Sequence, residues 1–269
     1  MLDIQGQEDT REIPLEKVGI KGLRYPIRVL DRVKGTQDTV ARADLFVNLP
    51  KHFKGTHMSR FIENFQRHRN KLGMPHFLAM LEEICVDLDA QSAYGSLDFP
   101  YFLDKEAPVS GLESVMSYDC RYEGSVHRCE GREGFTSDFI VQVAVPVHTL
   151  CPCSKAISEH GAHNQRGIVT IRLELGPFFW IEDIIEIAEN AASSPLWSLL
   201  KREDEKYVTE RAWDKPSFVE DLVRDVYIGI EALGHFPWFS VEAENMESIH
   251  NHSAFAYVEY GSRRQGECP

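Results

Sequence analysis

Thiol and imidazole side chains gather in a short stretch of the second half of the sequence. Cys151 and Cys153 flank a proline, and His160 and His163 follow closely. Sulfur and nitrogen donors at such close range are typical of a site for a transition metal such as zinc. Spacing alone leaves a second interpretation open, in which the thiols are half-buried and the imidazoles lie on the surface. The stretch is therefore a candidate metal site.

A second cluster of ligand-type residues lies near the end of the sequence, between the last two expected strands. It contains Glu247, His250 and His252 within the segment 244–253. The two histidines would point the same way in an extended chain, because side chains alternate along a strand. If the strands that carry both clusters are neighbours in one sheet, the clusters combine into one site of cysteine, histidine and glutamate.

The donor types predict what such a site would do. A structural zinc site closes four protein ligands around the ion, whereas an ion with a carboxylate ligand and an open position activates water. We therefore expect a catalytic centre. Cys151 could instead be a nucleophile whose thiolate is favoured by a neighbouring imidazolium. We favour the ligand role, and metal analysis of a Cys151→Ala variant would separate the two interpretations.

A run of charged residues, 200–210, is expected to form a long loop between two helices. Lys201, Arg202 and Lys206 could bind phosphate oxygens, and a carboxylate of the run could bind a metal. Most such runs are solvated surface, which is the interpretation that the sequence alone favours.

Two expected helix starts carry further charged groups. Arg60 lies in the segment 54–61, where free backbone N–H groups could bind an anion, although a plain helix cap is simpler. Ser217 and Glu220 have the spacing of a capping box. A buried carboxylate at Glu220 could also hold the paired N–H groups of a guanine.

Hydrophobic periodicity predicts the same order of elements twice. Alternating apolar residues predict strands, and apolar residues that recur every three or four positions predict helices. The first half contains strands near 27–30, 41–49, 97–101 and 116–122 and helices near 58–72 and 77–88. The second half contains strands near 139–147, 169–175, 239–243 and 255–260 and helices near 181–192 and 218–233.

This order predicts an α+β fold of two tandem ββααββ units, with helices packed on one face of antiparallel sheets. We divide the chain into an N-terminal segment, 1–22, a first unit, 23–128, and a second unit, 129–269, which carries most of the metal site. The units together form one bimodular catalytic domain.

Composition excludes several classes of protein. The chain has 269 residues and a net charge of −13, which disfavours nucleic-acid and anionic-membrane partners. We find neither an apolar run of about 18 residues that could cross a membrane nor an apolar leader. Six cysteines, including Cys268, are too sparse for a disulfide scaffold, so we expect reduced thiols and a cytoplasmic location.

Six motifs together resemble GTP cyclohydrolase I of type IB, also called the GTP cyclohydrolase IV family. They are GTHMSRF (55–61), APVSG (107–111), LCPCSK (150–155), GAHNQR (161–166), DEKYVTE (204–210) and IHNHSA (249–254), and VGIKGLRYPI (18–27) is also similar. The resemblance implies a tunnelling fold and a homo-oligomer, a homotetramer with sites at subunit boundaries.

The implied reaction converts GTP to 7,8-dihydroneopterin triphosphate and formate, the entry to folate-type pterins and queuosine-type deazapurines. Metal-activated water attacks C8 of the purine, the imidazole ring opens, the ribose rearranges and a new ring closes. One divalent transition metal per active site, Mn, Fe or Zn, is implied, and no organic cofactor.

The resemblance also implies residue roles. The metal ligands are Cys151, His163, Glu205 and His250. Cys151, Glu247 and His252 carry catalysis, the last two through proton transfer, while the role of Cys153 stays open. The substrate-binding residues are Glu220 for the guanine edge and, for the triphosphate, Arg60, Lys155, Arg166, Lys201, Arg202 and Lys206.

Three alternatives remain at this point. A related enzyme could open GTP and stop at a cyclic-phosphate dihydroneopterin. A non-catalytic protein on the same fold could bind a metal or a purine without turnover. A structural metalloprotein would close four protein ligands around its ion.

Overall fold

Eight strands follow one another in a single sheet whose order is the order of the chain, from β1 to β8. The computed structural model describes residues 8–129, 131 and 133–263. Residues 1–7 of the predicted N-terminal segment and 264–269 of the predicted second unit, with Cys268, lie outside the described residues. The elements are β1 (Leu15–Asp31), β2 (Gly35–Leu49), α1 (Met58–His68), a short 3-10 helix (Arg69–Lys71), α2 (Met74–Asp87), β3 (Ser92–Glu106), β4 (Glu113–Arg128), β5 (Phe135–Leu150), α3 (Pro152–Ile157), β6 (Asn164–Glu174), α4 (Ile181–Ala191), α5 (Arg202–Asp214), α6 (Val219–Leu233), β7 (Trp238–Met246) and β8 (Ala254–Gly261).

The predicted α+β class and doubled ββααββ order are confirmed. The first copy is β1, β2, α1, α2, β3 and β4, and the second is β5, β6, α4, α6, β7 and β8. Pairing is antiparallel from β1 through β3 and from β6 through β8. The second copy contains two inserted helices, α3 and α5, and these follow from its longer connections.

Contacts divide the chain into two compact units. Unit 1 contains the described residues before Pro100, Arg121–Val141 and Arg263, and unit 2 contains Pro100–Cys120 and Gln142–Ser262. The strands β3, β4 and β5 each run from one unit into the other. The division at residue 128 is a division of the sequence into repeats and stays a prediction.

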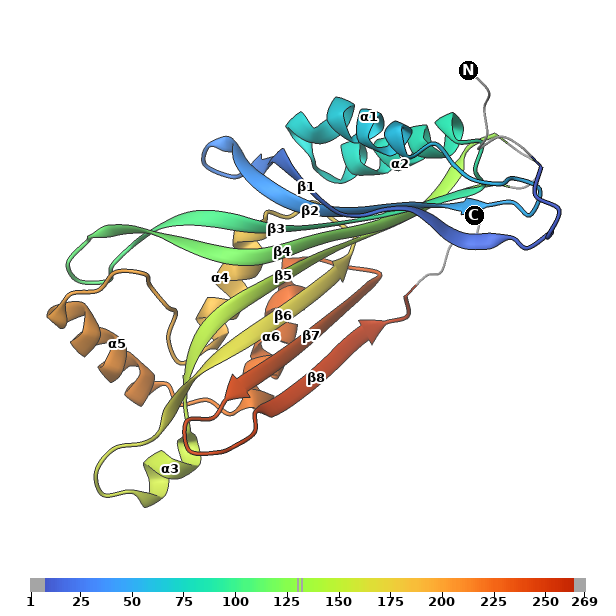
Figure 1. The fold of residues 1–269 in the computed structure, drawn as a ribbon. Helices are drawn as coiled ribbons and strands as arrows, with labels where there is room; N and C mark the ends of the chain where they lie inside the picture. The colour runs from blue at the N-terminus through green and yellow to red at the C-terminus, as the bar shows by residue number, and fades with distance from the viewer. Residues whose placement is uncertain (1–7, 130, 132, 264–269) are drawn as a thin grey trace. The chain divides into compact units, whose positions relative to one another are not determined.

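The core of unit 1 lies between one face of its strands and the helices α1 and α2, which lie side by side over that face (Figure 1). Alternation in β2 places Ala43, Leu45 and Val47 in this core. The helices contribute buried aromatic and aliphatic residues, including Phe61 and Phe77. Each fully buried side chain of this size stabilises the fold by roughly 1.5–3 kcal/mol.

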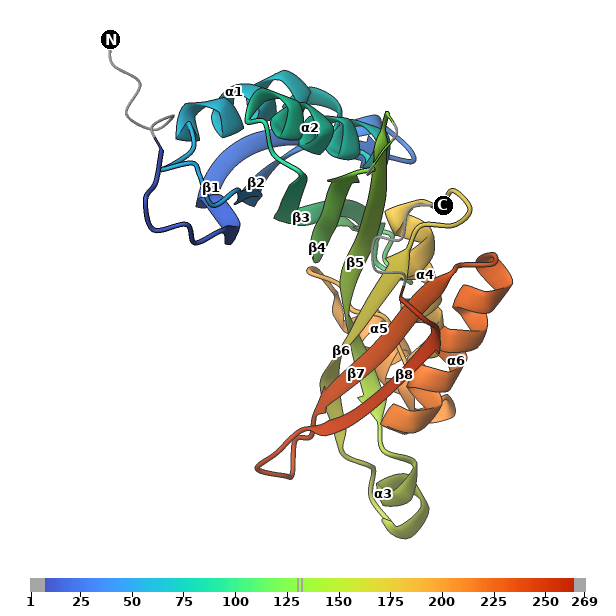
Figure 2. The same cartoon turned by 90° about the vertical axis from the view of Figure 1, so that its right-hand side faces the viewer.

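Unit 2 is built in the same way, with α4 and α6 over one face of its strands (Figure 2). Its interior also contains two acidic side chains on α4. Tyr101 donates a hydrogen bond of 2.8 Å to Glu182, and Tyr118 donates one of 2.8 Å to Glu189. Lys105 lies 2.6 Å from Glu189. These partners are needed because a buried carboxylate without hydrogen bonds is costly.

The prediction of a loop at 200–210 is wrong, because most of this run belongs to helix α5. Only Asp204 and Ala212 of α5 are buried, so the apolar stripe by which helices are recognised is missing. The helix is started by a local contact instead. The Asp204 carboxylate accepts a hydrogen bond of 2.8 Å from the Lys201 N–H, and the acidic first turn suits the helix dipole.

The predicted capping box of Ser217 and Glu220 is also wrong. The N-cap of α6 is Phe218, and no side chain caps it. The N–H of Ser217 bonds to the carbonyl of Leu150, and its hydroxyl donates to the carbonyl of Phe218. Ser217 is therefore fixed to the end of β5, and Glu220 is left in the first turn of α6 without a capping role.

The predicted helix at 58–72 ends earlier than expected. Helix α1 stops at His68, and Gly73 is the N-cap of α2. Within the described ranges, every helix is too short or too polar to span a membrane.

Candidate metal and substrate site

One cavity of unit 2, of about 290 Å³, brings the two ligand-type clusters together. It lies where β5 and β6 meet α3 and the first turn of α6, beside the turn between β7 and β8. Its lining residues are Cys151, His163, Gln165, Ser217, Phe218, Val219, Glu220, Asn245, Glu247, His250, His252 and Ala254.

Cys151 stands at the N-cap of α3, directly after β5. Its Sγ accepts a hydrogen bond of 3.5 Å from the Ser154 N–H. Cysteine sulfur is a common ligand of transition metals, so this position places one such ligand at the cavity. Cys153 is exposed on α3 and lies outside the cavity lining.

His163 is held beside Cys151 by the main chain. The Cys151 N–H bonds to the His163 carbonyl at 3.1 Å, and the His163 N–H bonds to the Ser154 hydroxyl at 3.2 Å. On the imidazole, Nδ1 lies 3.2 Å from Gln165 Oε1 and 3.4 Å from Glu247 Oε2. An imidazole with one nitrogen against acceptor oxygens is typical of a metal ligand.

His250 and His252 lie in the turn between β7 and β8, so the chain there is not extended as the alternation argument assumed. Their rings are nevertheless adjacent, stacked at 5.2 Å between centroids. Both line the cavity.

Two buried oxygen atoms in the cavity wall are incompletely hydrogen-bonded. Within the described residues, Asn245 Oδ1 has no hydrogen-bond partner, and Glu247 Oε2 has only the contact of 3.4 Å with His163 Nδ1. Leaving such a group unsatisfied costs about 1–3 kcal/mol or more, which indicates that a bound group supplies the missing interaction. Together with a thiol and three imidazoles, these are donor types that suit a divalent transition metal and a substrate rich in N–H groups.

Asn245 and Gln165 were missed by the sequence analysis. Asn245 is 1% exposed and stands opposite Gly167 in the pairing of β6 with β7. A Cβ at Gly167 would come within 2.3 Å of Asn245 Oδ1, so the glycine makes room for this side chain. Each residue stands at the end of a set of alternating buried positions, Gln165 at the start of β6 and Asn245 near the end of β7, and this was the signal that could have found them.

Glu220 lines the cavity from the first turn of α6. Its side chain is exposed and its backbone lies at a helix N-terminus. This is a position from which a carboxylate can meet a ligand in the cavity.

Glu205 does not join the cavity. It is exposed on α5, whereas its neighbour Asp204 is fully buried and accepts bonds from the Val109 and Ser110 N–H groups and the Ser110 hydroxyl at 2.6–2.9 Å. Burial raises the pKa of Asp204, but these hydrogen bonds outweigh burial and hold it well below its usual range. In the part of the chain that the structure describes, no three His, Cys, Asp or Glu side chains are grouped closely enough to hold an ion.

The six basic residues predicted to bind triphosphate also lie outside the cavity lining. Arg60 belongs to unit 1 and donates to the Asp87 carbonyl. In unit 2, Lys155 donates to the Trp213 carbonyl, and Lys206 pairs with Glu210 at 3.0 Å. The other three have exposed positions on β6 and at the start of α5: Arg166, Lys201 and Arg202.

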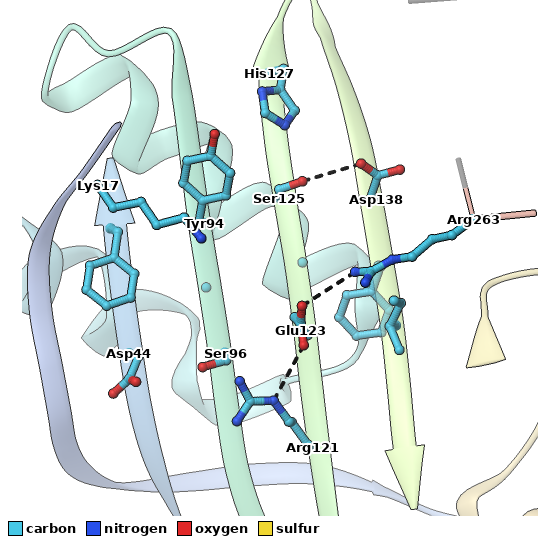
Figure 3. Close-up of a pocket in the computed structure, with 15 residues that line it drawn as sticks. Lys17, Asp44, Tyr94, Ser96, Arg121, Glu123, Ser125, His127, Asp138 and Arg263 are labelled. Carbon is cyan, nitrogen blue, oxygen red and sulfur yellow. Dashed lines mark hydrogen bonds and ion pairs between the residues drawn. The ribbon is translucent and has the colours of Figure 1, made fainter. Parts of the chain in front are cut away.

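Unit 1 has a larger cavity of about 640 Å³ with none of the predicted site residues (Figure 3). Three of its charged side chains form ion pairs with one another, and a hydroxyl contacts a fourth. Arg121 lies 3.6 Å from Glu123, Arg263 lies 3.4 Å from Glu123, and the Ser125 hydroxyl lies 3.4 Å from Asp138.

Comparison with known proteins gives one consistent result. Residues 1–256 match the family model described as type I GTP cyclohydrolase folE2. The chain is 51% identical over 266 residues to GTP cyclohydrolase FolE2 of Geotalea uraniireducens, covering 99% of this chain and 96% of that protein. It is 52% identical over 259 residues to GTP cyclohydrolase FolE2 of Syntrophus aciditrophicus, covering 96% of this chain and 99% of that protein.

Solved structures with a similar fold are uricases. The uricase of Bacillus fastidious aligns with a TM-score of 0.54 at 8% identity, covering 91% of this chain and 92% of that one. The uricase of Arthrobacter globiformis aligns with a TM-score of 0.51 at 6% identity, covering 94% and 96%. At such low identity the likeness concerns the fold alone, and it confirms the predicted tunnelling fold.

Proposed function

Because the chain belongs to the type I GTP cyclohydrolase FolE2 family, we propose that it catalyses the metal-dependent hydrolysis of GTP to 7,8-dihydroneopterin triphosphate and formate. This is the entry step of folate-type pterin synthesis and, by the same product, of queuosine-type deazapurine synthesis. The observation that carries the proposal is the single cavity lined by Cys151, His163, Glu220, Glu247 and His250.

One divalent transition metal, Mn, Fe or Zn, is proposed to bind Cys151, His163 and His250, with Glu205 as a further ligand. When bound, such an ion acts as a Lewis acid and lowers the pKa of water at the site. Glu205 is exposed and outside the cavity of its own chain. Its role therefore requires that α5 moves or that a neighbouring copy supplies this carboxylate.

Glu220 is proposed to fix the base. A carboxylate has only acceptor oxygens, and the guanine edge presents two adjacent N–H groups. Two parallel charge-assisted bonds would orient the purine and select guanine over adenine, whose edge lacks this pair of donors. The position of Glu220 on the cavity wall supports this role.

Glu247 and His252 are proposed to move the protons of the reaction. Addition of water to C8, opening of the imidazole ring, loss of formate, rearrangement of the ribose and ring closure each need a proton given or taken. Imidazole suits this task near neutral pH. His252 stands beside the proposed ligand His250, with its ring 5.2 Å away.

The triphosphate carries several negative charges, while the chain has a net charge of −13. Local cations must therefore outweigh the field of the whole protein. The proposed set is Arg60, Lys155, Arg166, Lys201, Arg202 and Lys206. Because these lie outside the cavity lining, we place the triphosphate beyond it, toward a neighbouring copy of the chain.

A homotetramer with sites at subunit boundaries is the proposed assembly. In unit 2, β8 is the last strand of the sheet, and its Phe255 and Tyr257 are 60% and 50% exposed. An edge strand with exposed aromatic residues is suited to pairing with another chain.

The test is formate release and pterin formation from GTP by metal-stripped protein, alone and after addition of Mn, Fe or Zn. Metal-dependent formation of dihydroneopterin triphosphate is the expected result. A cyclic-phosphate product would assign the related reaction, and GTP binding without formate release under every metal would contradict catalysis.

A further inference from the structure

Gln165 connects a buried threonine to His163. It stands on β6, is 5% exposed and lines the cavity of unit 2. Its Nε2 donates a hydrogen bond of 2.9 Å to Oγ1 of Thr149, which is fully buried on β5. Its Oε1 lies 3.2 Å from His163 Nδ1. The side chain therefore has both ends engaged and little freedom to rotate.

Two oxygen atoms lie close to His163 Nδ1, one from Gln165 and one from Glu247. Glu247 Oε2 lies 3.4 Å from Nδ1, and the two side chains are 14% and 13% exposed. Because Gln165 Nε2 donates to Thr149, it is the amide oxygen that faces Nδ1, and an amide oxygen accepts hydrogen bonds and donates none. Nδ1 must therefore be the donor, and it shares its proton between Gln165 Oε1 and the otherwise unpartnered Glu247 Oε2.

With the proton on Nδ1, a neutral imidazole keeps its lone pair on Nε2. The main chain of His163 is already fixed through Ser154 and Cys151. What remains free is the rotation of the ring, and this is the motion that the contact with Gln165 restricts. A ligand nitrogen is then presented in one orientation before any ion arrives.

We propose that Gln165 is a positioning residue that, together with Glu247, holds His163 as the Nδ1–H tautomer and leaves Nε2 to bind the metal. The inference rests on the proposed function for the use made of Nε2. The tautomer itself is a property of the metal-free protein, so the tautomer and the proposed function can be tested, and can fail, separately.

The direct test is long-range ¹⁵N–¹H correlation NMR of the metal-free protein labelled at histidine, recorded where the imidazole is neutral. The signals of His163 are assigned by comparison with His163→Ala. A protonated Nδ1 and an unprotonated Nε2 are expected. The opposite tautomer, with the proton on Nε2, would overturn the inference whether or not the protein turns over GTP.

The second test is zinc affinity, measured by competition with a chromophoric chelator. Gln165→Leu removes the acceptor and should weaken binding by about 10- to 100-fold, as loss of an outer-shell partner typically does. Gln165→Glu keeps an acceptor oxygen and should restore affinity to within a few fold of wild type. Rescue by the glutamate separates positioning from a general loss of packing.

Two matched controls come from the same sheet. Gln142→Leu makes the same substitution on β5 outside the cavity lining, and it should leave zinc affinity unchanged. Thr149→Val releases the far end of the amide and should weaken zinc binding less than Gln165→Leu. If Gln165→Leu does not fold, the zinc affinities of Thr149→Val and Gln165→Glu can still be compared with that of the wild type.

The experiments distinguish failure of the proposed function from failure of the positioning role. If wild-type protein binds no metal and releases no formate, the proposed function fails while the tautomer result stands. If wild-type protein turns over GTP but Gln165→Leu changes neither the tautomer nor the zinc affinity, the positioning role is contradicted.

Discussion

The cavities of unit 1 and unit 2 differ in how their polar groups are satisfied. In unit 1, Glu123 forms ion pairs with Arg121 and Arg263 in the lining of the larger cavity. In unit 2, the smaller cavity holds the buried Asn245 Oδ1, which has no hydrogen-bond partner among the described residues, and Glu247 Oε2, which lies 3.4 Å from His163 Nδ1. Cavity size alone would place the functional site in unit 1, whereas the incompletely hydrogen-bonded oxygens place it in unit 2.

This difference indicates that a functional site can be recognised by polar groups whose hydrogen bonds are left for a ligand to complete. A folded chain normally pairs its buried polar groups, because an unpaired one costs free energy. The cavity of unit 2 retains such a group despite its cost in free energy. The cavity also contains a thiol and imidazoles, which are donors that transition metals prefer.

The largest effect is expected from Cys151→Ala, which removes the thiolate ligand from the cavity of unit 2. Metal content and formate release should both fall by more than the roughly 10- to 100-fold that follows loss of an outer-shell partner. Metal analysis and a formate assay measure this. Cys153→Ala is the control, since Cys153 is exposed outside the lining, and equal loss in both variants would refute the distinction.

A smaller effect is expected from Glu220→Gln. Replacing a charge-assisted pair of bonds should weaken GTP binding about 10- to 100-fold, since bonds to charged groups are worth about 1.5–3 kcal/mol. Calorimetry on metal-stripped protein measures it without turnover. The control is Asp221→Asn, because Asp221 pairs with Arg224 at 3.3 Å instead of lining the cavity. Unaltered affinity in folded Glu220→Gln would remove this residue from the site.

Gly167→Ala tests whether the wall of the cavity is built around Asn245. The new Cβ would clash with Asn245 Oδ1, and overpacking of this kind costs about 1–3 kcal/mol of the free energy of unfolding. Denaturant titration measures the loss. In an Asn245→Ala background the same substitution should cost less, because the clashing oxygen is gone, and strictly additive effects would contradict the contact.

The smallest effect is expected in the cavity of unit 1. Arg121→Ala breaks ion pairs with Asp98 at 2.7 Å and Glu123 at 3.6 Å, all partly exposed. Pairs of this kind contribute about 0.2–1 kcal/mol, so the free energy of unfolding should fall by about 1 kcal/mol or less. Metal content should stay at the wild-type value. Loss of metal from this variant would contradict the contrast between the cavities.

Sequence patterns predicted the elements that have one buried face. Buried apolar residues alternate with more exposed residues along 41–49 because helices cover one face of β2. The sequence pattern therefore predicts this strand. Helix α5 was not predicted because it buries little of its surface. The Asp204 carboxylate that caps its first turn locally is itself held by the N–H groups of Val109 and Ser110, far away in sequence. No local pattern encodes such a contact.

The candidate site was partly predictable for a similar reason. Cysteine and histidine are rare enough to be noticed in clusters. The structure brings five of the residues named for metal binding or catalysis into one cavity lining: Cys151, His163, Glu247, His250 and His252. Gln165 and Asn245 are common polar residues whose importance lies in their burial. Only the fold reveals that they face the interior.

The most direct test of the central claim is anomalous scattering from crystals of the protein grown with manganese or zinc. One metal peak per chain is expected in the cavity of unit 2, within bonding distance of Cys151 Sγ and an imidazole nitrogen of His163. A peak among the paired charges of the unit 1 cavity, or no peak beside Cys151 in protein that turns over GTP, would contradict it.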